Sequence, residues 1–317
     1  VAGPTASSCS GPSEGCTADS ATGASGRRAD RSRNLTDIFD SAGTDKASMH
    51  GYHRYYEREL APYRGQDGLR LLEIGVGGGH SMKAWSDYFA APAALHGVDR
   101  GWDTEDRRRK ICELVGEERC PVVKVFSADQ GNETEMRAVI GAEPQGWDVI
   151  IDDGSHVPAH QVGSFRLLFP RLRPGGLYVV EDLTPSYQDR GDIGGYPLIG
   201  GVGAPYPGSA VEKFKELVDV VMRGHFFSPQ YTVFGKHIDH DVVRVNFGDG
   251  IVFVEKRPLG EDWDYFFPPP ASVWWLIPQF AGTVSRAEAA AEARRRAELP
   301  VEQALEREAA RWKRPVP

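Results

Sequence analysis

Five side chains able to bind metal ions or move protons follow two apolar runs. In the stretch WDVIIDDGSHVPAH, the apolar residues VII are followed at once by Asp152, Asp153 and His156. In GGLYVVEDL, a second apolar run ends at Glu181 and Asp182. Such runs are typical of strands covered on both faces. Neighbouring parallel strands end at the same edge of a sheet, so we expect the carboxylates to meet in one crevice.

Carboxylates so close together repel one another unless a positive charge lies among them. Mg²⁺, a hard cation that binds carboxylate and water oxygens, would relieve this repulsion. We therefore predict a magnesium site formed by Asp153, Glu181 and Asp182. The alternative is that the acids cap the following helices and point into solvent. We expect this of Asp152, because Pro158 is typical of a first helical turn.

His156 lies three residues after Asp153 on the same predicted loop. An imidazole titrates near neutral pH and can accept a proton from an alcohol whose pKa a metal ion has lowered. His156 as base and Asp153 as metal ligand are therefore the predicted catalytic residues. The alternative for His156 is a structural role at a helix start, and His160, one turn later, is expected in the core.

A glycine-rich turn, LLEIGVGGGHS, joins the first predicted strand to its helix, and glycines there let the backbone approach a ligand closely. The next strand ends in GVD, which offers a carboxylate to ribose hydroxyls, and the third ends in SADQ, which offers polar groups to an adenine edge. Each feature alone also suits a helix cap or a surface turn, but their agreement favours a nucleoside pocket. The predicted pocket residues are Glu73, Gly75, Gly77, Ser81, Asp99, Ser127, Asp129 and Gln130.

The acid in front of the glycines distinguishes between nucleoside ligands. Glu73 would repel the pyrophosphate of a dinucleotide. It suits a cationic ligand such as S-adenosylmethionine, which carries an ammonium and a sulfonium. The sequence therefore predicts a methyl donor site and not a dehydrogenase site.

Strand and helix patterns alternate along the middle of the chain, which predicts an α/β fold with a doubly wound, Rossmann-like parallel sheet. Two alternating runs around GDG predict an antiparallel hairpin at the end of this sheet. The predicted strands cover 69–76, 94–99, 121–129, 147–154 and 175–183, with helices at 80–90, 103–116, 159–172 and 209–226 and the hairpin at 241–257.

Composition divides the chain into three parts. Residues 1–33 are expected to form a disordered tail, because they contain few large apolar side chains. Residues 34–257 are expected to form the catalytic domain, with a Gly- and Pro-rich lid loop at about 185–208. Residues 258–317 are expected to form an aromatic and proline-rich segment and a terminal helix that is exposed or contacts a partner, including a second copy of the chain.

Charge and cysteine content limit the partners and the compartment. The net charge of -8 argues against a nucleic-acid partner, and no apolar run is long enough to span a membrane. The four cysteines form no Cys-x-x-Cys pair, so we expect free thiols in a reducing cytoplasm. The N-terminus lacks the pattern of a secretion signal.

Taken together, the motifs GTDKASMHGYHRYYERELAPYR, LLEIGVGGGHSMKAW, DVIIDDGSHVPAHQ, LFPRLRPGGLYVVEDLTPSY and VNFGDGIVFVEK resemble the metal-dependent sugar O-methyltransferases of antibiotic biosynthesis. The family includes the O-methyltransferases that act on mycinamicin and demethylmacrocin, and the resemblance covers about residues 35–257. The resemblance implies a class I methyltransferase sheet. We expect a departure from the mycinamicin type, with a short tail where that type has an N-terminal domain and a C-terminal segment that is not part of the shared core.

The resemblance also implies roles for single residues. Metal ligands of the family fall on Asp153, Glu181 and Asp182, and the proposed base falls on His156. The S-adenosylmethionine pocket falls on Glu73, Gly75, Asp99 and Asp129, whereas Lys46, His53 and Tyr56 would fold over the cofactor or substrate.

The expected function is O-methylation of a sugar hydroxyl on a glycosylated natural product, with S-adenosylmethionine and Mg²⁺ and a small-molecule glycoside as acceptor. One alternative keeps the metal and the donor but takes a catechol-type or cephalosporin-type acceptor. Another is a nucleoside-binding protein without catalysis that joins a complex through the terminal helix.

Overall fold

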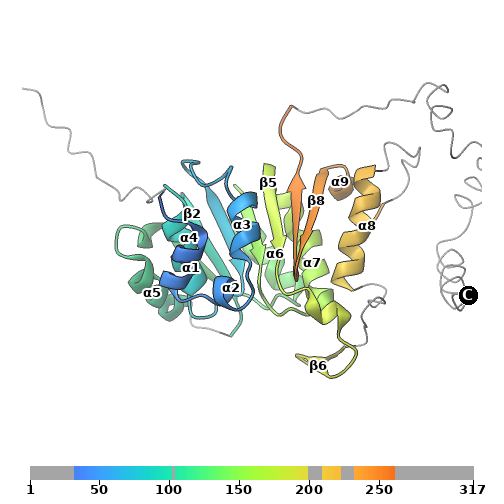
Figure 1. The fold of residues 1–317 in the computed structure, drawn as a ribbon, viewed down its shortest axis with the longest axis horizontal. Coiled ribbons are helices and arrows are strands. Elements are labelled where there is room, and N and C mark those ends of the chain that lie inside the picture. Colours follow the sequence, from blue (N-terminus) through green and yellow to red (C-terminus); the bar gives the residue numbers. More distant parts are fainter. Residues whose placement is uncertain (1–31, 102–103, 199–208, 223–231, 261–317) are drawn as a thin grey trace, which may run out of the picture.

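A computed structural model describes residues 32–101, 104–198, 209–222 and 232–260 (Figure 1). Most of the predicted tail, the second half of the predicted lid loop, the aromatic segment and the terminal helix lie outside these residues. The predicted division of the chain into three parts therefore stays a prediction.

The described residues form one mixed sheet of seven strands in the order β3-β2-β1-β4-β5-β9-β8. The first five strands are parallel, β9 is antiparallel to β5, and β8 is antiparallel to β9. The predicted α/β fold with a terminal hairpin is confirmed. The strands are β1 (Arg70–Ile74), β2 (Ala94–Asp99), β3 (Val123–Ser127), β4 (Trp147–Asp152), β5 (Leu172–Val180), β8 (Val242–Gly248) and β9 (Ile251–Lys256).

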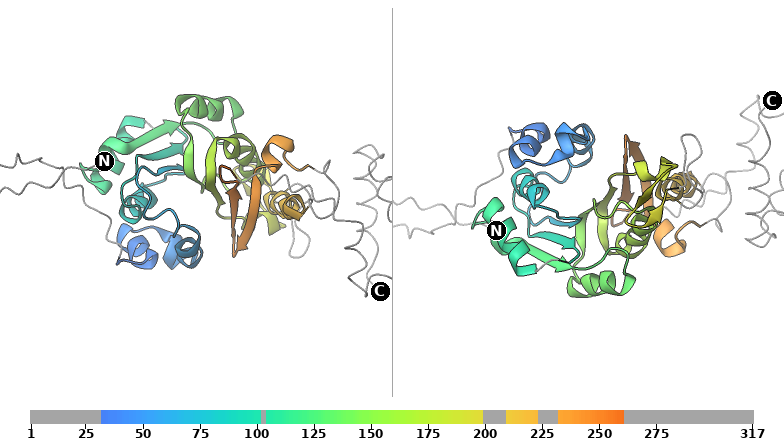
Figure 2. Two further views of the ribbon diagram at one scale, coloured as in Figure 1. Left: turned by 90° about the horizontal axis from the view of Figure 1, so that it is seen from above. Right: turned by 90° about the horizontal axis from the view of Figure 1, so that it is seen from below.

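Helices cover both faces of the sheet, as Figure 2 shows. Alternate residues of the same strands face opposite layers: Leu71 and Val149 pack with the helices of one face, and Leu72 and Ile150 with those of the other. The first face carries α1 (Leu35–Ala42), α3 (His53–Glu59), α4 (His80–Tyr88) and α5 (Thr104–Val115), and the second carries α6 (Glu133–Ala142), α7 (Pro158–Leu168) and α8 (Ala210–Met222). The shorter elements are α2 (Asp45–Ser48), α9 (Lys236–Asp239), η1 (Cys120–Val122), η2 (Phe169–Arg171), η3 (Thr184–Tyr187) and the small hairpin of β6 (Asp192–Ile193) and β7 (Tyr196–Pro197).

The N-terminal segment, residues 35–59, packs on the first face of the sheet and reaches its carboxyl edge through α2. In α1, Leu35, Ile38 and Phe39 recur at helical spacing and are fully buried. Asn34 caps the helix by accepting a hydrogen bond from the Asp37 amide, and Gly43 ends it with a left-handed φ of 76°. The chain then turns into α2, which brings its side chains to the ends of β4 and β5.

Two features differ from the sequence analysis. Helix α6 was not predicted, because only Met136 and Val139 of its residues are buried and its apolar pattern is too short to stand out. The expected free thiols are wrong for Cys112 and Cys120, which form a disulfide. Their eight-residue separation is closed by a turn at Gly116, with a φ of 89°, that brings their Cα atoms to 4.8 Å.

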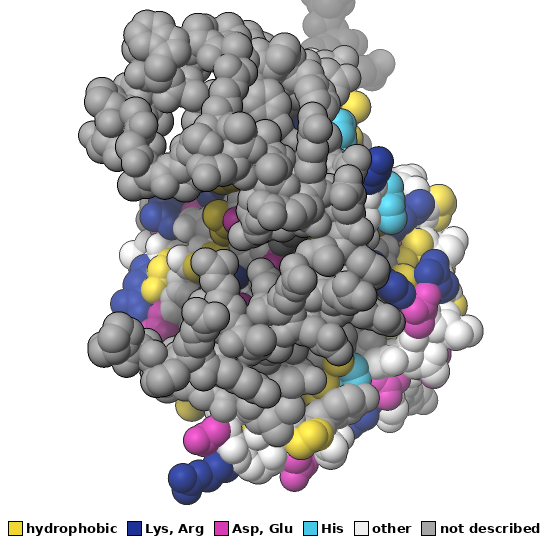
Figure 3. All heavy atoms as spheres, turned by 90° about the vertical axis from the view of Figure 1, so that its right-hand side faces the viewer, with side chains coloured by type: hydrophobic (Ala, Val, Ile, Leu, Met, Phe, Trp, Pro, Cys, Tyr) yellow, Lys and Arg dark blue, Asp and Glu magenta, His cyan; other side chains and the backbone are white. Residues whose placement is uncertain are grey.

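The surface shown in Figure 3 is the face at the right of Figure 1. Where side chains of described residues are visible on it, acidic, basic and apolar ones are interspersed. Among the described helices, none has the length and apolar character that crossing a bilayer requires.

The β1–α4 loop and the β4–α7 loop touch through their backbones. Gly75 has a φ of 88°, and a Cβ atom on it would lie 1.9 Å from the carbonyl oxygen of Asp153. No side chain other than hydrogen fits there, so Gly75 determines how closely the glycine-rich turn approaches the acidic loop.

We expect Gly75→Ala to lower the free energy of unfolding by about 3 kcal/mol or more, because strain from the left-handed backbone adds to backbone overlap. Gly77→Ala is the matched control, since Gly77 has a φ of 50° but no atom within 4 Å of its Cβ position. Its cost should be about 1–2 kcal/mol, from the backbone alone. Urea unfolding measures both, and equal losses would contradict the close approach.

Candidate active site

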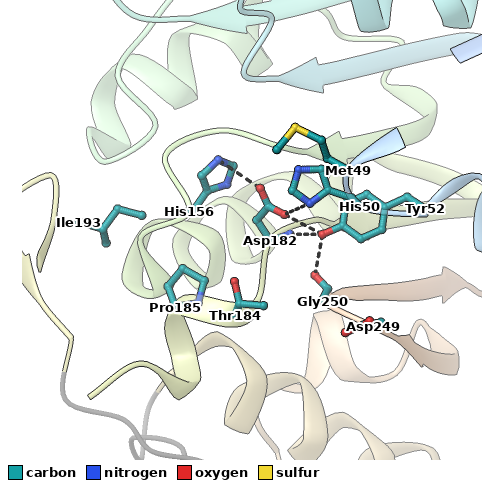
Figure 4. A pocket seen from close by; sticks show the side chains of 10 residues that line it. All are labelled: Met49, His50, Tyr52, His156, Asp182, Thr184, Pro185, Ile193, Asp249 and Gly250. Atoms are coloured by element: carbon teal, nitrogen blue, oxygen red, sulfur yellow. Dashed lines mark hydrogen bonds and ion pairs between the residues drawn. The ribbon is translucent and has the colours of Figure 1, made fainter. Parts of the chain in front are cut away.

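Two cavities lie beside each other at the carboxyl edge of the sheet. The larger, of about 760 Å³, is lined by the ends of β1 and β2 and by the loops after β3 and β4. The smaller, of about 300 Å³, lies between the N-terminal segment, the stretch after β5 and the β8–β9 turn (Figure 4). The loop after β4 contributes to both.

This loop faces the two cavities with successive residues. Ser155 and Val157 line the larger cavity, and His156 between them lines the smaller one. The backbone of His156 is left-handed, with a φ of 58°. A residue other than glycine rarely adopts this conformation, and where it does, the surrounding structure must hold it.

Asp182 is the centre of the smaller cavity. It accepts a hydrogen bond from the Tyr52 hydroxyl at 2.7 Å, and its carboxylate lies 3.5 Å from Nδ1 of His50 and 3.5 Å from Nε2 of His156. Figure 4 shows these three side chains converging on it. Asp182 also has a left-handed backbone, with a φ of 52°. Asp182 and His156 are the only non-glycine residues with positive φ in the described part of the chain, and their side chains face each other.

The structure brings together part of the predicted metal site. One ligand atom each of Asp153, His156 and Asp182 lies within 4.8 Å of the others. All three side chains are partly exposed, at 23%, 30% and 24%. Nδ1 of His156 is buried and makes no hydrogen bond. Two carboxylates and an imidazole at this spacing are a donor set that suits a divalent cation.

The third predicted ligand, Glu181, is buried and lies outside this group. Its Oε1 accepts hydrogen bonds from the ammonium of Lys46 at 2.7 Å and from the hydroxyl of Tyr56 at 2.5 Å. Burial and repulsion from Asp153 raise the pKa of Glu181 to about 8, although Lys46 opposes this. The adjacent residues after β5 therefore lie in different surroundings: Glu181 is in the interior, and Asp182 lines the smaller cavity.

Lys46 and Tyr56 lie beneath the cavities and do not cover a ligand as expected. Their side chains are buried, and Lys46 also lies 3.8 Å from Glu73. Burial alone would lower the pKa of Lys46, but Asp153, Glu181 and Glu73 together raise it well above its usual value. The same segment does reach the cavity, through Met49, His50 and Tyr52, whereas His53 lines neither cavity.

Asp152 is not a helix cap. It is fully buried, and both its oxygens accept hydrogen bonds from the Gln130 amide, at 2.7 and 2.8 Å. Helix α7 begins after Val157 with no side-chain cap. Burial raises the pKa of Asp152 to about 7. Gln130, expected to meet an adenine edge, also accepts a hydrogen bond from the Ser155 amide, so its side chain ties the acidic loop to the end of β3.

The larger cavity contains four of the predicted nucleoside-binding residues. Asp99 accepts hydrogen bonds from the Gly77 and Arg100 amides and so fixes the glycine-rich turn against the end of β2. The four that line the cavity are Gly75, Asp99, Asp129 and Gln130, and those that do not are Glu73, Gly77, Ser81 and Ser127.

Glu73 lies below the glycine-rich turn. It accepts hydrogen bonds from the Ser81 hydroxyl at 2.7 Å and the Trp85 indole at 3.1 Å. Burial raises its pKa to about 7, although Lys46 opposes this. Its charge therefore acts on the cavity floor from beneath.

Two further features of the larger cavity bear on its ligand. A Cβ on Gly131 would lie 2.5 Å from the His160 ring, and one on Gly154 would lie 2.4 Å from the Gln130 amide. Neither position has room for a side chain, and the backbone lines the cavity at both. His160, expected in the core, is half-buried at this cavity, with Nδ1 2.9 Å from the Ser155 hydroxyl. The helical spacing that suggested a core position does not account for the cavity beside α7.

Known proteins with this architecture include enzymes that methylate sugars. The chain is 35% identical over 222 residues to the 8-demethyl-8-alpha-L-rhamnosyl tetracenomycin-C 2'-O-methyltransferase of Streptomyces olivaceus, which covers 68% of this chain and 52% of that protein. It is 32% identical over 217 residues to the mycinamicin VI 2''-O-methyltransferase of Micromonospora griseorubida, covering 66% and 48%. The chain resembles the sugar O-methyltransferases of antibiotic pathways. The predicted resemblance is confirmed.

Solved structures agree with these sugar O-methyltransferases. The MycE methyltransferase of the mycinamycin pathway in complex with Mg and SAH matches with a TM-score of 0.58 at 29% identity, covering 72% of this chain and 56% of that one. Its complex with Mg, SAH and mycinamycin VI matches with a TM-score of 0.55 at 28% identity, covering 73% and 56%. No family model matches the chain. The chain spans about half the length of the curated relatives it matches.

The buried acids predict how stability depends on pH. With pKa values of about 7 for Glu73 and Asp152 and about 8 for Glu181, the folded protein holds protons that the unfolded chain has lost. The free energy of unfolding of the metal-free protein should therefore fall between about pH 6.5 and 8.5, by on the order of 2–4 kcal/mol. Denaturant unfolding in the presence of a chelator measures this.

Asp152→Asn should reduce this fall by about 1 kcal/mol, because it removes one of the three protons. Glu117→Gln, at an exposed position after α5, is the control and should leave the fall unchanged. A metal-free protein whose stability rises over this pH range would contradict the raised pKa values.

Proposed function

We propose that the chain is an S-adenosylmethionine- and Mg²⁺-dependent O-methyltransferase that methylates a sugar hydroxyl of a glycosylated natural product. The observation that carries the proposal is the position of the carboxylate–histidine group, whose ligand atoms lie within 4.8 Å of one another, one residue from the wall of a cavity of about 760 Å³. The names of the relatives and the Mg, SAH and mycinamycin VI complexes of MycE support it.

S-adenosylmethionine suits the larger cavity. Asp99, at the end of β2, is available to ribose hydroxyls, and Asp129, after β3, to the adenine amino group. At Gly75, Gly131 and Gly154 a side chain would overlap neighbouring protein atoms, so backbone forms the wall of the cavity at these positions. The buried charge of Glu73 favours a cation above it, which matches the ammonium and sulfonium of this donor.

Asp153, Glu181 and Asp182 are proposed to hold Mg²⁺. The ion prefers oxygen ligands, which favours the three carboxylates over the imidazole. The hydrogen bonds that Lys46 and Tyr56 donate to Glu181 are both accepted by Oε1. When bound, Mg²⁺ lowers the pKa of a hydroxyl that it coordinates and orients it.

His156 is proposed to take the proton of that hydroxyl. Its imidazole faces the smaller cavity, and the Asp182 carboxylate 3.5 Å away stabilises the imidazolium that results. The left-handed backbone at both residues holds them toward each other in advance of the reaction. Holding the hydroxyl oxygen against the donor methyl supplies much of the rate enhancement.

The smaller cavity supports a neutral sugar as acceptor. At about 300 Å³ it is at the lower limit of ligand pockets, so one sugar ring enters it and the rest of a large glycoside stays outside. Among the residues that line it, none is Lys or Arg, so no permanently cationic side chain selects an anionic acceptor there. Met49, 78% exposed at the rim, offers an apolar contact to an aglycone.

Two substitutions separate the metal role from the base role. Asp153→Asn should abolish both Mg²⁺ binding and turnover, because it removes a ligand charge. His156→Ala should lower turnover by about 10²–10⁴-fold, the usual contribution of a general base, and leave Mg²⁺ affinity unchanged. His240→Ala, at an exposed site after α9, should change neither. Calorimetry with Mg²⁺ and methyl transfer from labelled S-adenosylmethionine to a panel of macrolide and polyketide glycosides measure them.

Each other outcome has a definite meaning. Loss of Mg²⁺ affinity in His156→Ala would make the histidine a metal ligand and remove it as base. Full activity with a chelator present would refute the metal role. Methylation of catechols in preference to glycosides would replace the sugar acceptor, and donor binding without transfer to any acceptor would favour a binding protein.

A further inference from the structure

Lys46 lines neither cavity but contacts the acids at the ends of three strands. Its side chain is 1% exposed, and Nζ lies 2.6 Å from Asp153 Oδ2, 2.7 Å from Glu181 Oε1 and 3.8 Å from Glu73 Oε1. Glu73 lies near the end of β1, Asp153 directly follows β4 and Glu181 directly follows β5. One ammonium from α2 therefore connects three strand ends.

The contacts of Asp153 divide the acidic cluster into two parts. Toward the interior, Asp153 shares Lys46 with Glu181, which is 2% exposed. Toward the cavity, it belongs to the group with His156 and Asp182. The ammonium thus occupies the inner side of Asp153, where a second cation would be repelled. Only the cavity side of the carboxylate is left for an ion.

Resting on the proposed function, we propose that Lys46 is a positioning residue for the metal ligands. It holds the Asp153 and Glu181 carboxylates in place and confines a divalent ion to the cavity side of Asp153, next to His156 and Asp182. It does not touch the acceptor or the donor. Tyr56 assists it through the second hydrogen bond to Glu181 Oε1.

Two effects of losing this ammonium oppose each other. Removing a positive charge makes the cluster more attractive to Mg²⁺. Removing the partner that orients two ligand carboxylates makes the ligands less ready, and partners of this kind usually contribute about 10–100-fold to metal affinity. We expect the loss of orientation to outweigh the gain in negative charge. Asp153 and Glu181 are held by their ion pairs with Lys46, and without the ammonium they no longer keep their orientation.

The test is Mg²⁺ titration by calorimetry into the metal-free full chain. Lys46→Met keeps the length and loses the charge, and it should weaken Mg²⁺ binding about 10–100-fold. Lys46→Arg should recover part of the affinity, because a guanidinium donates to both carboxylates. Lys213→Met, at a half-buried site on α8 that pairs with Glu216 at 3.1 Å, is the control and should bind Mg²⁺ as the unchanged chain does.

Thermal unfolding of each variant separates positioning from stability. A purely structural role would lower the unfolding temperature of Lys46→Met but leave its Mg²⁺ affinity, measured well below that temperature, unchanged. If Lys46→Met does not fold, two other variants test the inference. Lys46→Gln removes the charge and Tyr56→Phe removes the hydrogen bond to Glu181. Each should weaken Mg²⁺ binding, but by less than the roughly 10–100-fold expected of Lys46→Met.

The outcomes distinguish this inference from the proposed function. Unchanged or tighter Mg²⁺ binding by Lys46→Met, with the unchanged chain binding one ion, would overturn the role of Lys46 alone. If the unchanged chain binds no Mg²⁺ at millimolar concentration, the proposed metal-dependent activity falls as well.

Discussion

The structure depends on how negative charge is held at the carboxyl edge of the sheet. Glu73, Asp153, Glu181 and Asp182 are brought there by neighbouring strands, and three of them share the buried ammonium of Lys46. Without that counter-charge, burying these carboxylates would cost several kcal/mol each in order of magnitude. The N-terminal segment therefore does more than cover one face of the sheet: through Lys46 it supplies the cation that stabilises the carboxyl edge.

Backbone conformation then determines which acids face outward. Glu181 and Asp182 are adjacent, yet one lies in the interior and the other in the smaller cavity. The left-handed residues His156 and Asp182 turn their side chains toward each other, and Gly75 allows the glycine-rich turn to approach the loop that carries His156. Strain is thus located where two cavities meet, which is the arrangement expected of a site that transfers a group from one bound molecule to another.

The similarity to sugar O-methyltransferases covers about two thirds of this chain and about half of each relative. The smaller cavity, of about 300 Å³, has an exposed methionine at its rim. A ligand larger than one ring would therefore also contact the surface around this cavity.

Local patterns in the sequence were sufficient for the strands, the GDG hairpin and the meeting of Asp153 with Asp182, because period and parallel alternation are encoded by neighbouring residues. They were insufficient for three contacts between distant segments. Lys46 pairs with Asp153, 107 residues away, the Gln130 amide donates a hydrogen bond to Asp152, and His50 lies beside Asp182. Those contacts depend on how separate segments pack. A sequence shows that an acidic cluster needs a cation, but only the packed structure decides which side chain provides it and which oxygens stay free.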